Sequence, residues 1–249
     1  MAGNAGALQN RSRNGLSWNY LTTETNFAKG VQTTIDLYVF PPSPRAFKVM
    51  VIANHLGIET NIRPLDLIKG EQKTPEYAAL NPNMRMPALK DGGYVLWESS
   101  AIAQYLAGKK PDSGLFPKDE RARLDVTRWQ FWDVAHWDPA CAVFLFENIV
   151  KPVVLKSGEP DPAALAKGGE NFERAAKVLD AQLTGKKFIT GDTPTIADFC
   201  IAAPLNYAEM ARLPLDSCRE IKRWYASMRA LPAWQKTLAQ CALPAAAAA

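Results

Sequence analysis

The spacing of apolar residues changes about 110 residues into this 249-residue chain, and this change strongly constrains the fold. Between residues 34 and 110, short β-branched and aromatic runs alternate with helical stretches, as in a sheet covered by helices. After residue 120, the regular apolar segments have helical spacing. The pattern therefore predicts an α/β unit followed by an all-α unit.

The α/β unit is expected to open with a strand, a helix and a second strand. TIDLYVF (34–40) is β-branched and aromatic, as a buried strand should be. Ser43 then stands at the N-cap of a helix, Pro44 is its first helical residue, and Gly57 ends it. The run NIRPLDL (61–67) is predicted to form the second strand.

The same unit is expected to close with a hairpin and a helix. A polar loop with a short helix (68–77) leads to MPALK (86–90) and YVLW (94–97), which flank the turn signal DGG. A helix that begins at a charged cap, Glu98, is predicted to end at Gly108. Together these elements would make a compact three-layer unit.

The all-α unit is expected to pack around one strongly apolar helix, TPTIADFCIAAPL (193–205). This helix opens with a capping box formed by Thr195 and Asp198, with Asp in place of the usual Glu. Further helices are predicted over residues 120–137, 163–183, 217–230 and 232–241.

Composition marks the ends of these units. The first residues are rich in Asn, Gly, Ser and Thr without a sustained period, and the linker PDSGLFPKDE carries two prolines. The expected division is an N-terminal extension over 1–33, an α/β domain over 34–110, a linker over 111–120, a helical domain over 121–243 and an alanine tail over 244–249.

Composition also argues against several classes of protein. The net charge of +4 comes from scattered Lys and Arg, whereas nucleic-acid binding usually shows a clustered basic face. No apolar stretch reaches the roughly 20 residues of a membrane span, and no signal core is evident, so a cytoplasmic protein is expected. No metal site is expected, because there are only two histidines and the cysteines are far apart. Reduced thiols are expected at Cys141, Cys200, Cys218 and Cys241.

Two features of the α/β unit point to a ligand, and each has a structural alternative. Ser43 lies at a helix N-terminus, where backbone N–H groups favour an anion, although it could be a plain helix cap. Met86-Pro87 opens a strand, and a cis bond there would expose the backbone of Met86 for pairing with a bound peptide. An ordinary trans loop proline is the alternative.

Two further pairs point the same way. Glu98-Ser99 opens a helix whose N–H groups and serine hydroxyl would cradle a carboxylate, although a simple cap is the alternative. Gln72-Lys73 in the polar loop is a donor pair for a carboxylate, although a solvated loop is the alternative.

In their order and spacing, these segments resemble the glutathione S-transferases. PPSPRAFKV resembles the active-site segment of the serine-type classes, most like the plant phi class and related bacterial enzymes. KGEQKTPEYAALNPNMRMPAL, LWESSAIAQYLA and GDTPTIADF resemble, in turn, the glutathione loop with its cis-proline, the Glu-Ser helix start and the capping box of the second domain. The resemblance covers residues 34–234 and implies a thioredoxin-like N-terminal domain followed by a C-terminal helical bundle.

The resemblance also implies roles for individual residues. Ser43 would donate its hydroxyl to the sulfur of glutathione, and the backbone of Met86, before Pro87, would pair with the cysteinyl part. The residues implied at the two ends of the tripeptide are Gln72 and Lys73 at the glycine carboxylate, and Glu98 and Ser99 at the γ-glutamyl group.

The chain departs from the family pattern at three places. Gln72 stands where phi enzymes often carry His, and Arg85 replaces a frequent Gln and would add a charge contact to the tripeptide. Asn83 and Met84 stand where NPFG is common. The missing aromatic puts in doubt a hydrophobic plug between subunits, but a homodimer is still implied.

The resemblance implies an enzyme that uses glutathione as co-substrate to conjugate hydrophobic electrophiles and, in addition, to reduce peroxides. The electrophile would lie beside the first long helix of the second unit, where Trp129, Trp132 and His136 are candidates for its pocket. Most aromatic residues at helical spacing are core residues, so only one or two of these are expected to line the pocket.

Two other functions remain open at this stage. Thiol–disulfide exchange would need a nucleophilic thiol at position 43, and a serine cannot form a mixed disulfide. A non-catalytic scaffold or ligand carrier on the same fold is the other alternative, because a fold does not fix a function.

Overall fold

The computed structural model describes residues 34–241, so the predicted extension over 1–33 and the alanine tail lie outside the described residues. The first half contains β1 (Ile35–Val39), α1 (Pro44–His55), β2 (Thr60–Pro64), the 3₁₀ turn η1 (Glu71–Lys73), α2 (Pro75–Leu80), β3 (Ala88–Asp91), β4 (Tyr94–Trp97) and α3 (Ser99–Gly108). The second half contains η2 (Pro111–Ser113), α4 (Glu120–Trp132), η3 (Asp133–Trp137), α5 (Asp138–Leu145), η4 (Phe146–Val154), α6 (Pro162–Leu183), α7 (Ile196–Ala202), η5 (Ala203–Tyr207), α8 (Arg219–Arg229) and α9 (Pro232–Cys241).

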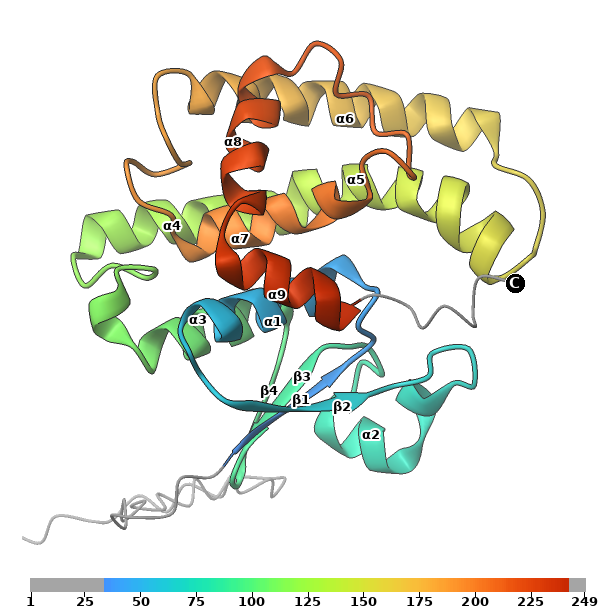
Figure 1. Ribbon diagram of the computed structural model, residues 1–249. Helices are drawn as coiled ribbons and strands as arrows, with labels where there is room; N and C mark the ends of the chain where they lie inside the picture. The colour runs from blue at the N-terminus through green and yellow to red at the C-terminus, as the bar shows by residue number, and fades with distance from the viewer. Residues whose placement is uncertain (1–33, 242–249) are drawn as a thin grey trace, which may run out of the picture. The chain divides into compact units, whose positions relative to one another are not determined.

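The four strands form one mixed sheet in the order β2-β1-β3-β4 (Figure 1). β1 and β2 are parallel, which requires the crossover through α1, and β3 and β4 form the antiparallel hairpin around DGG. The predicted order of elements is confirmed, although the second strand ends at Pro64, earlier than expected. Alternate residues of β1 are buried, as the strand period requires.

The helix α1 is buried on more than one side. It packs on α3 and also on α7, η5 and α9 of the helical half, so it lies between the sheet and the C-terminal helices (Figure 1). The sequence predicts a single buried stripe, but the structure buries all of residues 46–53, including Lys48. A polar residue in this stretch must therefore find its partner inside the protein.

The helical half is organised around one long helical path and one central helix. The path runs through α4, η3, α5 and η4, and its two η segments are π-helical, so helical backbone extends past the predicted end at residue 137. All seven residues of α7 are buried, as predicted for the core helix. Its capping box is confirmed, because the Asp198 carboxylate accepts the N–H of Thr195 at 2.8 Å. The same carboxylate also accepts the Trp224 indole N–H at 2.9 Å.

Two features are absent from residues 34–241. No helix in this part of the chain is both long and apolar enough to cross a membrane. In the same part, no group of three or more His, Cys, Asp or Glu side chains is placed to hold a metal ion.

Candidate functional site

The strand register brings the predicted ligand-binding segments to one end of the sheet. Tyr38 near the end of β1 pairs with Ala88 at the start of β3, which pairs in turn with Trp97 at the end of β4. Ser43 follows β1, Pro87 immediately precedes β3, and Glu98-Ser99 immediately follows β4. β2 is parallel to β1, so the loop with Gln72 and Lys73 also leaves the sheet at this end. We call this end the sulfur corner, defined by Ser43, Met86-Pro87, Glu98-Ser99 and Gln72-Lys73.

Ser43 caps α1 and keeps its hydroxyl proton available. Its Oγ accepts the backbone N–H of Arg45 at 3.2 Å, which is the predicted N-cap bond. Within residues 34–241, no side chain or carbonyl is recorded as accepting the Ser43 hydroxyl proton. The turn before Ser43 is fixed by its own N–H bonding to the Phe40 carbonyl at 2.8 Å, and by the Tyr207 hydroxyl, which donates to the Pro42 carbonyl.

The Met86–Pro87 peptide bond is cis, so the cis alternative is confirmed and the ordinary trans loop proline is excluded. The carbonyl of Arg85 just before it is held twice, by the Tyr77 hydroxyl at 2.8 Å and by the Asn81 side-chain amide at 2.6 Å. The sequence did not single out these two residues. The sequence feature that could have indicated them is that a tyrosine and an asparagine stand within the ten residues before Pro87.

Glu98 is at the N-cap position of α3, but its side chain forms no capping hydrogen bond. The predicted cap position is therefore confirmed, but the charged side chain does not cap the helix. The backbone of Glu98 has φ +71° and ψ 115°, a conformation that costs a non-glycine residue about 1–3 kcal/mol. Ser99 is buried at the first helical position, whereas Glu98 is exposed. A strained, exposed acidic residue at a helix N-terminus is more typical of a ligand contact than of a cap.

Gln72 and Lys73 lie in the 3₁₀ turn η1, which precedes α2. The Gln72 Oε1 atom is buried without a hydrogen-bond partner among the described residues, and Lys73 is exposed with no described ion-pair partner. The turn itself is fixed, because the Glu71 carboxylate accepts the N–H of Asp66 at 2.7 Å. The pair therefore has unused hydrogen-bonding capacity on an ordered loop.

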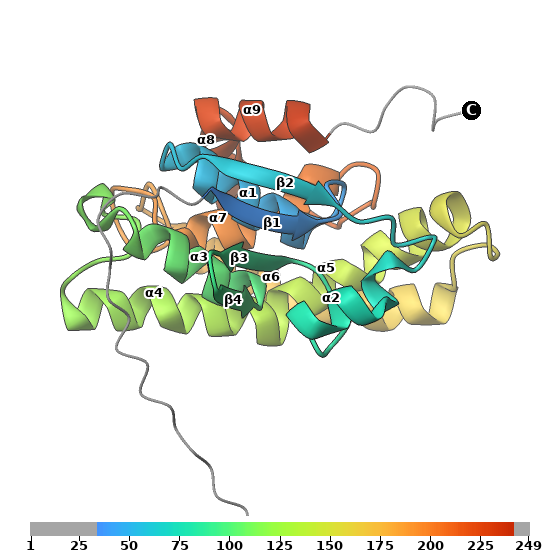
Figure 2. The ribbon, with the colours of Figure 1, turned by 90° about the horizontal axis from the view of Figure 1, so that it is seen from below.

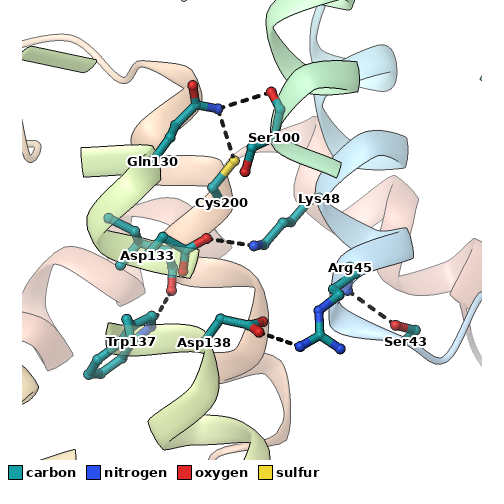
Figure 3. Close-up of polar contacts among 10 residues, drawn as sticks. Ser43, Arg45, Lys48, Ser100, Gln130, Asp133, Trp137, Asp138 and Cys200 are labelled. Atoms are coloured by element: carbon teal, nitrogen blue, oxygen red, sulfur yellow. Dashed lines mark hydrogen bonds and ion pairs between the residues drawn. The ribbon is translucent and has the colours of Figure 1, made fainter. Parts of the chain in front are cut away.

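Two ion pairs, not predicted from the sequence, connect α1 to the helical half (Figure 3). Arg45 pairs with Asp138 at the start of α5, and Lys48 Nζ lies 2.6 Å from Asp133 Oδ2 of η3, where both side chains are fully buried. Burial acts to lower the pKa of Lys48, but the neighbouring charges, Asp133 foremost, outweigh it and raise that pKa. The available signal in the sequence was a lone lysine inside the apolar run AFKVMVIA (46–53).

The three candidates for the electrophile pocket lie on the long helical path. Trp132 and His136 line a groove of about 420 Å³ between that path and α6, together with Pro139, Val143, Asn171 and Arg174. Trp129 is buried, and no hydrogen-bond partner for its indole N–H is found in the described part of the chain. None of the residues that define the sulfur corner lines this groove.

A mixed sheet with a cis-proline before β3, followed by a helical bundle packed on α1, defines the class of thioredoxin-like proteins with an appended helical half. Comparison with known proteins identifies the family within this class. The family model described as glutathione S-transferase, N-terminal domain, matches residues 33–108, and that described as glutathione S-transferase, C-terminal domain, matches residues 140–232.

Individual relatives agree with the family models. The chain is 36% identical over 217 residues to glutathione S-transferase 3 of Zea mays, covering 84% of this chain and 96% of that protein. It is 31% identical over 208 residues to glutathione S-transferase D7 of Drosophila melanogaster, covering 82% of this chain and 88% of that protein. The structure of glutathione S-transferase III in apo form matches with a TM-score of 0.75 and 34% identity, covering 85% of this chain and 98% of that one. The chain belongs to the glutathione S-transferase family. It is a glutathione transferase, with glutathione as its co-substrate.

Proposed function

We propose that the sulfur corner binds glutathione and that Ser43 activates its thiol for attack on a hydrophobic electrophile. The observation that carries this proposal is the state of Ser43, whose oxygen is fixed as the cap of α1 while its proton remains free to donate. A free thiol has a pKa near 8.5, so it is mostly protonated at neutral pH. A hydrogen bond to an ionised group contributes about 1.5–3 kcal/mol, which lowers a pKa by about one to two units.

The reaction follows from that thiolate. The thiol proton passes to solvent, and the sulfur forms a bond to the electrophilic carbon. A leaving group such as halide departs with the electrons of the bond it breaks. The same thiolate would attack the terminal oxygen of a hydroperoxide and break the O–O bond, which releases the alcohol and leaves the sulfenic acid of glutathione. A second glutathione thiol then forms the disulfide with that sulfur and releases water. An assay with cumene hydroperoxide tests this extension directly.

The remaining residues of the corner are proposed to hold the tripeptide. The backbone of Met86 pairs with the cysteinyl part, and Arg85 is exposed beside it. Lys73 binds the glycine carboxylate with Gln72, whose buried oxygen has no described partner. A carboxylate has no proton to donate to the Gln72 Oε1 atom. We therefore expect the Gln72 side chain to rotate so that its amide N–H₂ group donates to the carboxylate. Glu98 and Ser99 bind the γ-glutamyl ammonium and carboxylate.

The decisive experiment replaces Ser43 by Ala and follows the pH dependence of kcat/KM for a model aryl halide. The kinetic pKa of the bound thiol should rise by about one to two units, because one hydrogen bond to the thiolate is lost. Asp119→Ala is a matched control, since it removes another helix cap, the Asp119 carboxylate that accepts the Ala122 N–H at 2.9 Å. If the pH profile of Ser43→Ala equals that of the wild type, Ser43 is not the activating residue.

The electrophile is proposed to bind where the sulfur corner meets the long helical path. Trp132 and His136 line the groove on the α6 side of that path and are proposed to extend this site, with Trp129 behind them in the core. A Trp132→Ala variant should raise the KM for the electrophile and leave that for glutathione unchanged. An unchanged KM for a series of electrophiles of increasing size would remove the groove from the site.

Three organisational features complete the proposal. The boundary between the glutathione-binding and helical domains is proposed to lie in residues 111–120, which is compatible with matched family models that end at 108 and begin at 140. A cytoplasmic location is supported by the four free cysteines, which fit a reducing compartment, and imaging of the tagged chain tests it. The protein is proposed to form a homodimer, because apolar side chains of β4 and α4 are exposed, and sedimentation equilibrium tests this.

A non-catalytic carrier is the alternative, and it makes a different prediction for ligand binding. Calorimetry that detects no glutathione binding at millimolar concentration would favour it. Thiol–disulfide exchange has less support, because all four cysteines are buried, and burial raises the pKa of Cys141 well above the usual value.

A further inference from the structure

The side chain of Arg45 combines an anchored position with unused hydrogen-bonding capacity beside Ser43. We propose that Arg45 selects electrophiles that carry a carboxylate, and that Asp138 is the positioning residue that aims its guanidinium at them. This inference rests on the proposed function, because it concerns the second substrate of the same site. It adds a substrate class that the fold alone does not specify.

The position of Arg45 follows from the start of α1. Arg45 is the second residue of the helix, and its backbone N–H is the group that donates to the Ser43 oxygen at 3.2 Å. Its side chain runs toward Asp138 of α5 (Figure 3). The Arg45 side chain therefore reaches from the helix that Ser43 caps to the helical half, which is where the electrophile is proposed to bind.

The guanidinium is only partly used by its ion pair. Its Nη2 atom bonds Asp138 Oδ2, and no other side-chain contact of Arg45 is recorded with residues 34–241. A guanidinium has five N–H donors arranged in a fork that matches a carboxylate with two parallel bonds. The Arg45 side chain is 47% exposed, so the remaining donors can reach a ligand without first leaving a buried site.

Asp138 holds the Arg45 guanidinium in place, and the charges around this pair sum to zero. Its side chain is only 11% exposed, and Arg45 is its recorded ion-pair partner. The neighbouring carboxylate, Asp133, is neutralised separately by Lys48. The four charges balance, so an incoming carboxylate meets the free guanidinium donors rather than an excess of negative charge. A buried aspartate also fixes the direction of a long, flexible side chain, which reduces the entropy lost on binding.

The test compares two aryl halides of known intrinsic reactivity, neutral 1-chloro-2,4-dinitrobenzene and the carboxylate 4-chloro-3,5-dinitrobenzoate. The readout is the ratio of their kcat/KM values, each divided by the uncatalysed rate with glutathione. Arg45→Met should reduce the ratio of anionic to neutral substrate by about tenfold to 100-fold, the range expected for a charge-assisted hydrogen bond, mainly through KM. Arg45→Lys should recover part of the ratio, because it keeps the charge but loses the fork.

Asp138→Asn tests positioning, and it should lower the same ratio by a smaller factor than Arg45→Met. Arg63→Met is the matched control, because Arg63 lies on the edge strand β2 and forms an ion pair with Asp36 at a similar exposure, 53%. It should leave the ratio unchanged. With unaltered protein, raising the salt concentration should lower the ratio, since screening weakens the attraction, and this measurement does not depend on any variant folding.

Two results would overturn the inference. A ratio that is equal in the wild type and Arg45→Met shows that the arginine is structural only. An equal loss for both substrates, together with a raised thiol pKa, shows that Arg45 acts on the sulfur instead. Either result leaves the proposed role of Ser43 intact. Conversely, Ser43→Ala could keep the wild-type pH profile while the substrate ratio still depends on Arg45. That outcome would refute the role of Ser43 in activating the thiol and leave the inference about Arg45 standing.

Discussion

At the scale of single residues, different groups of the sulfur corner hold the backbone in place and remain available to a ligand. Ser43 uses its oxygen to cap α1, and Tyr207 and Tyr77 fix carbonyls on either side of the corner through their hydroxyls. The side chains and hydroxyl proton that are left over are those proposed to contact glutathione. Burial raises the pKa of Tyr207 to about 12, so its hydroxyl remains a donor throughout the physiological range.

Glu98 provides a prediction in which stability and binding change in opposite directions. Glu98→Gly should hold or increase the free energy of unfolding, because glycine adopts a φ of +71° without the strain that glutamate bears there. The KM for glutathione should rise about tenfold, since a charged contact to the γ-glutamyl group is lost. Chemical denaturation and steady-state kinetics measure the two quantities.

The control for this variant is Lys156→Gly, which relieves another positive φ, +50°, beyond the end of η4. It should change the stability in the same direction and leave the KM for glutathione at the wild-type value. A Glu98→Gly protein that is clearly less stable and binds glutathione normally would mean that the residue is structural.

At the scale of elements, α1 is the part that joins the two halves. The pair between Lys48 and Asp133 crosses this junction with both side chains buried, at 2.6 Å between Nζ and Oδ2. Lys48→Met should lower the free energy of unfolding by about 3–5 kcal/mol, because it leaves a buried carboxylate without its cation. Urea denaturation followed by tryptophan fluorescence measures the loss.

Lys177→Met is the matched control, because Lys177 forms an exposed pair with Glu173 on α6. It should leave stability close to the wild-type value. The double variant Lys48→Met with Asp133→Leu should recover much of the loss, since apolar groups can replace a buried ion pair with little net cost. If Lys48→Met alone is as stable as the wild type, the pair does not hold the halves together.

The same pair gives stability a defined dependence on pH. Burial acts to lower the pKa of Lys48, but the neighbouring charges together, Asp133 foremost, outweigh it, so the folded-state pKa lies above the ordinary 10.5. A raised pKa means that the folded state binds the proton more tightly than the unfolded chain does. The contribution is therefore complete below pH 10.5 and is lost as pH rises through the folded-state pKa. The unfolding free energy of the wild type should therefore fall relative to that of the double variant only as the pH rises through this alkaline range.

At the scale of the whole described unit, local pattern determined the order of elements but not the contacts between halves. The caps at Ser43 and Thr195 and the turn DGG are local signals, and the structure contains them where the sequence predicts. The burial of Lys48 could not be predicted in this way, because periodicity shows only that a helix has an apolar face. It does not show that α9 and η5 cover a second face. The positive φ of Glu98 could not be predicted either, because no residue near it in the sequence requires that conformation.

The proposed homodimer would form through the surface that β4 and α4 share at one edge of the sheet. β4 is an edge strand of the four-stranded sheet, with Tyr94 and Trp97 exposed, and an unpaired edge with apolar side chains favours association. α4 lies on the same side as β4 (Figure 2), and its Phe131 is 69% exposed. A second copy of the chain is the occupant we propose, because a two-fold contact would cover both elements in each copy at once.

Phe131→Glu should convert the dimer to a monomer, because each copy would place a charge in the apolar contact, and a two-fold interface doubles every substitution. Sedimentation equilibrium should give twice 27.4 kDa for the wild type and 27.4 kDa for the variant. Ile68→Glu is the matched control, since Ile68 is 71% exposed but follows β2 at the opposite edge of the sheet, and it should remain dimeric. A monomeric wild type, or a Phe131→Glu protein that stays dimeric, would show that this face is not the contact between copies.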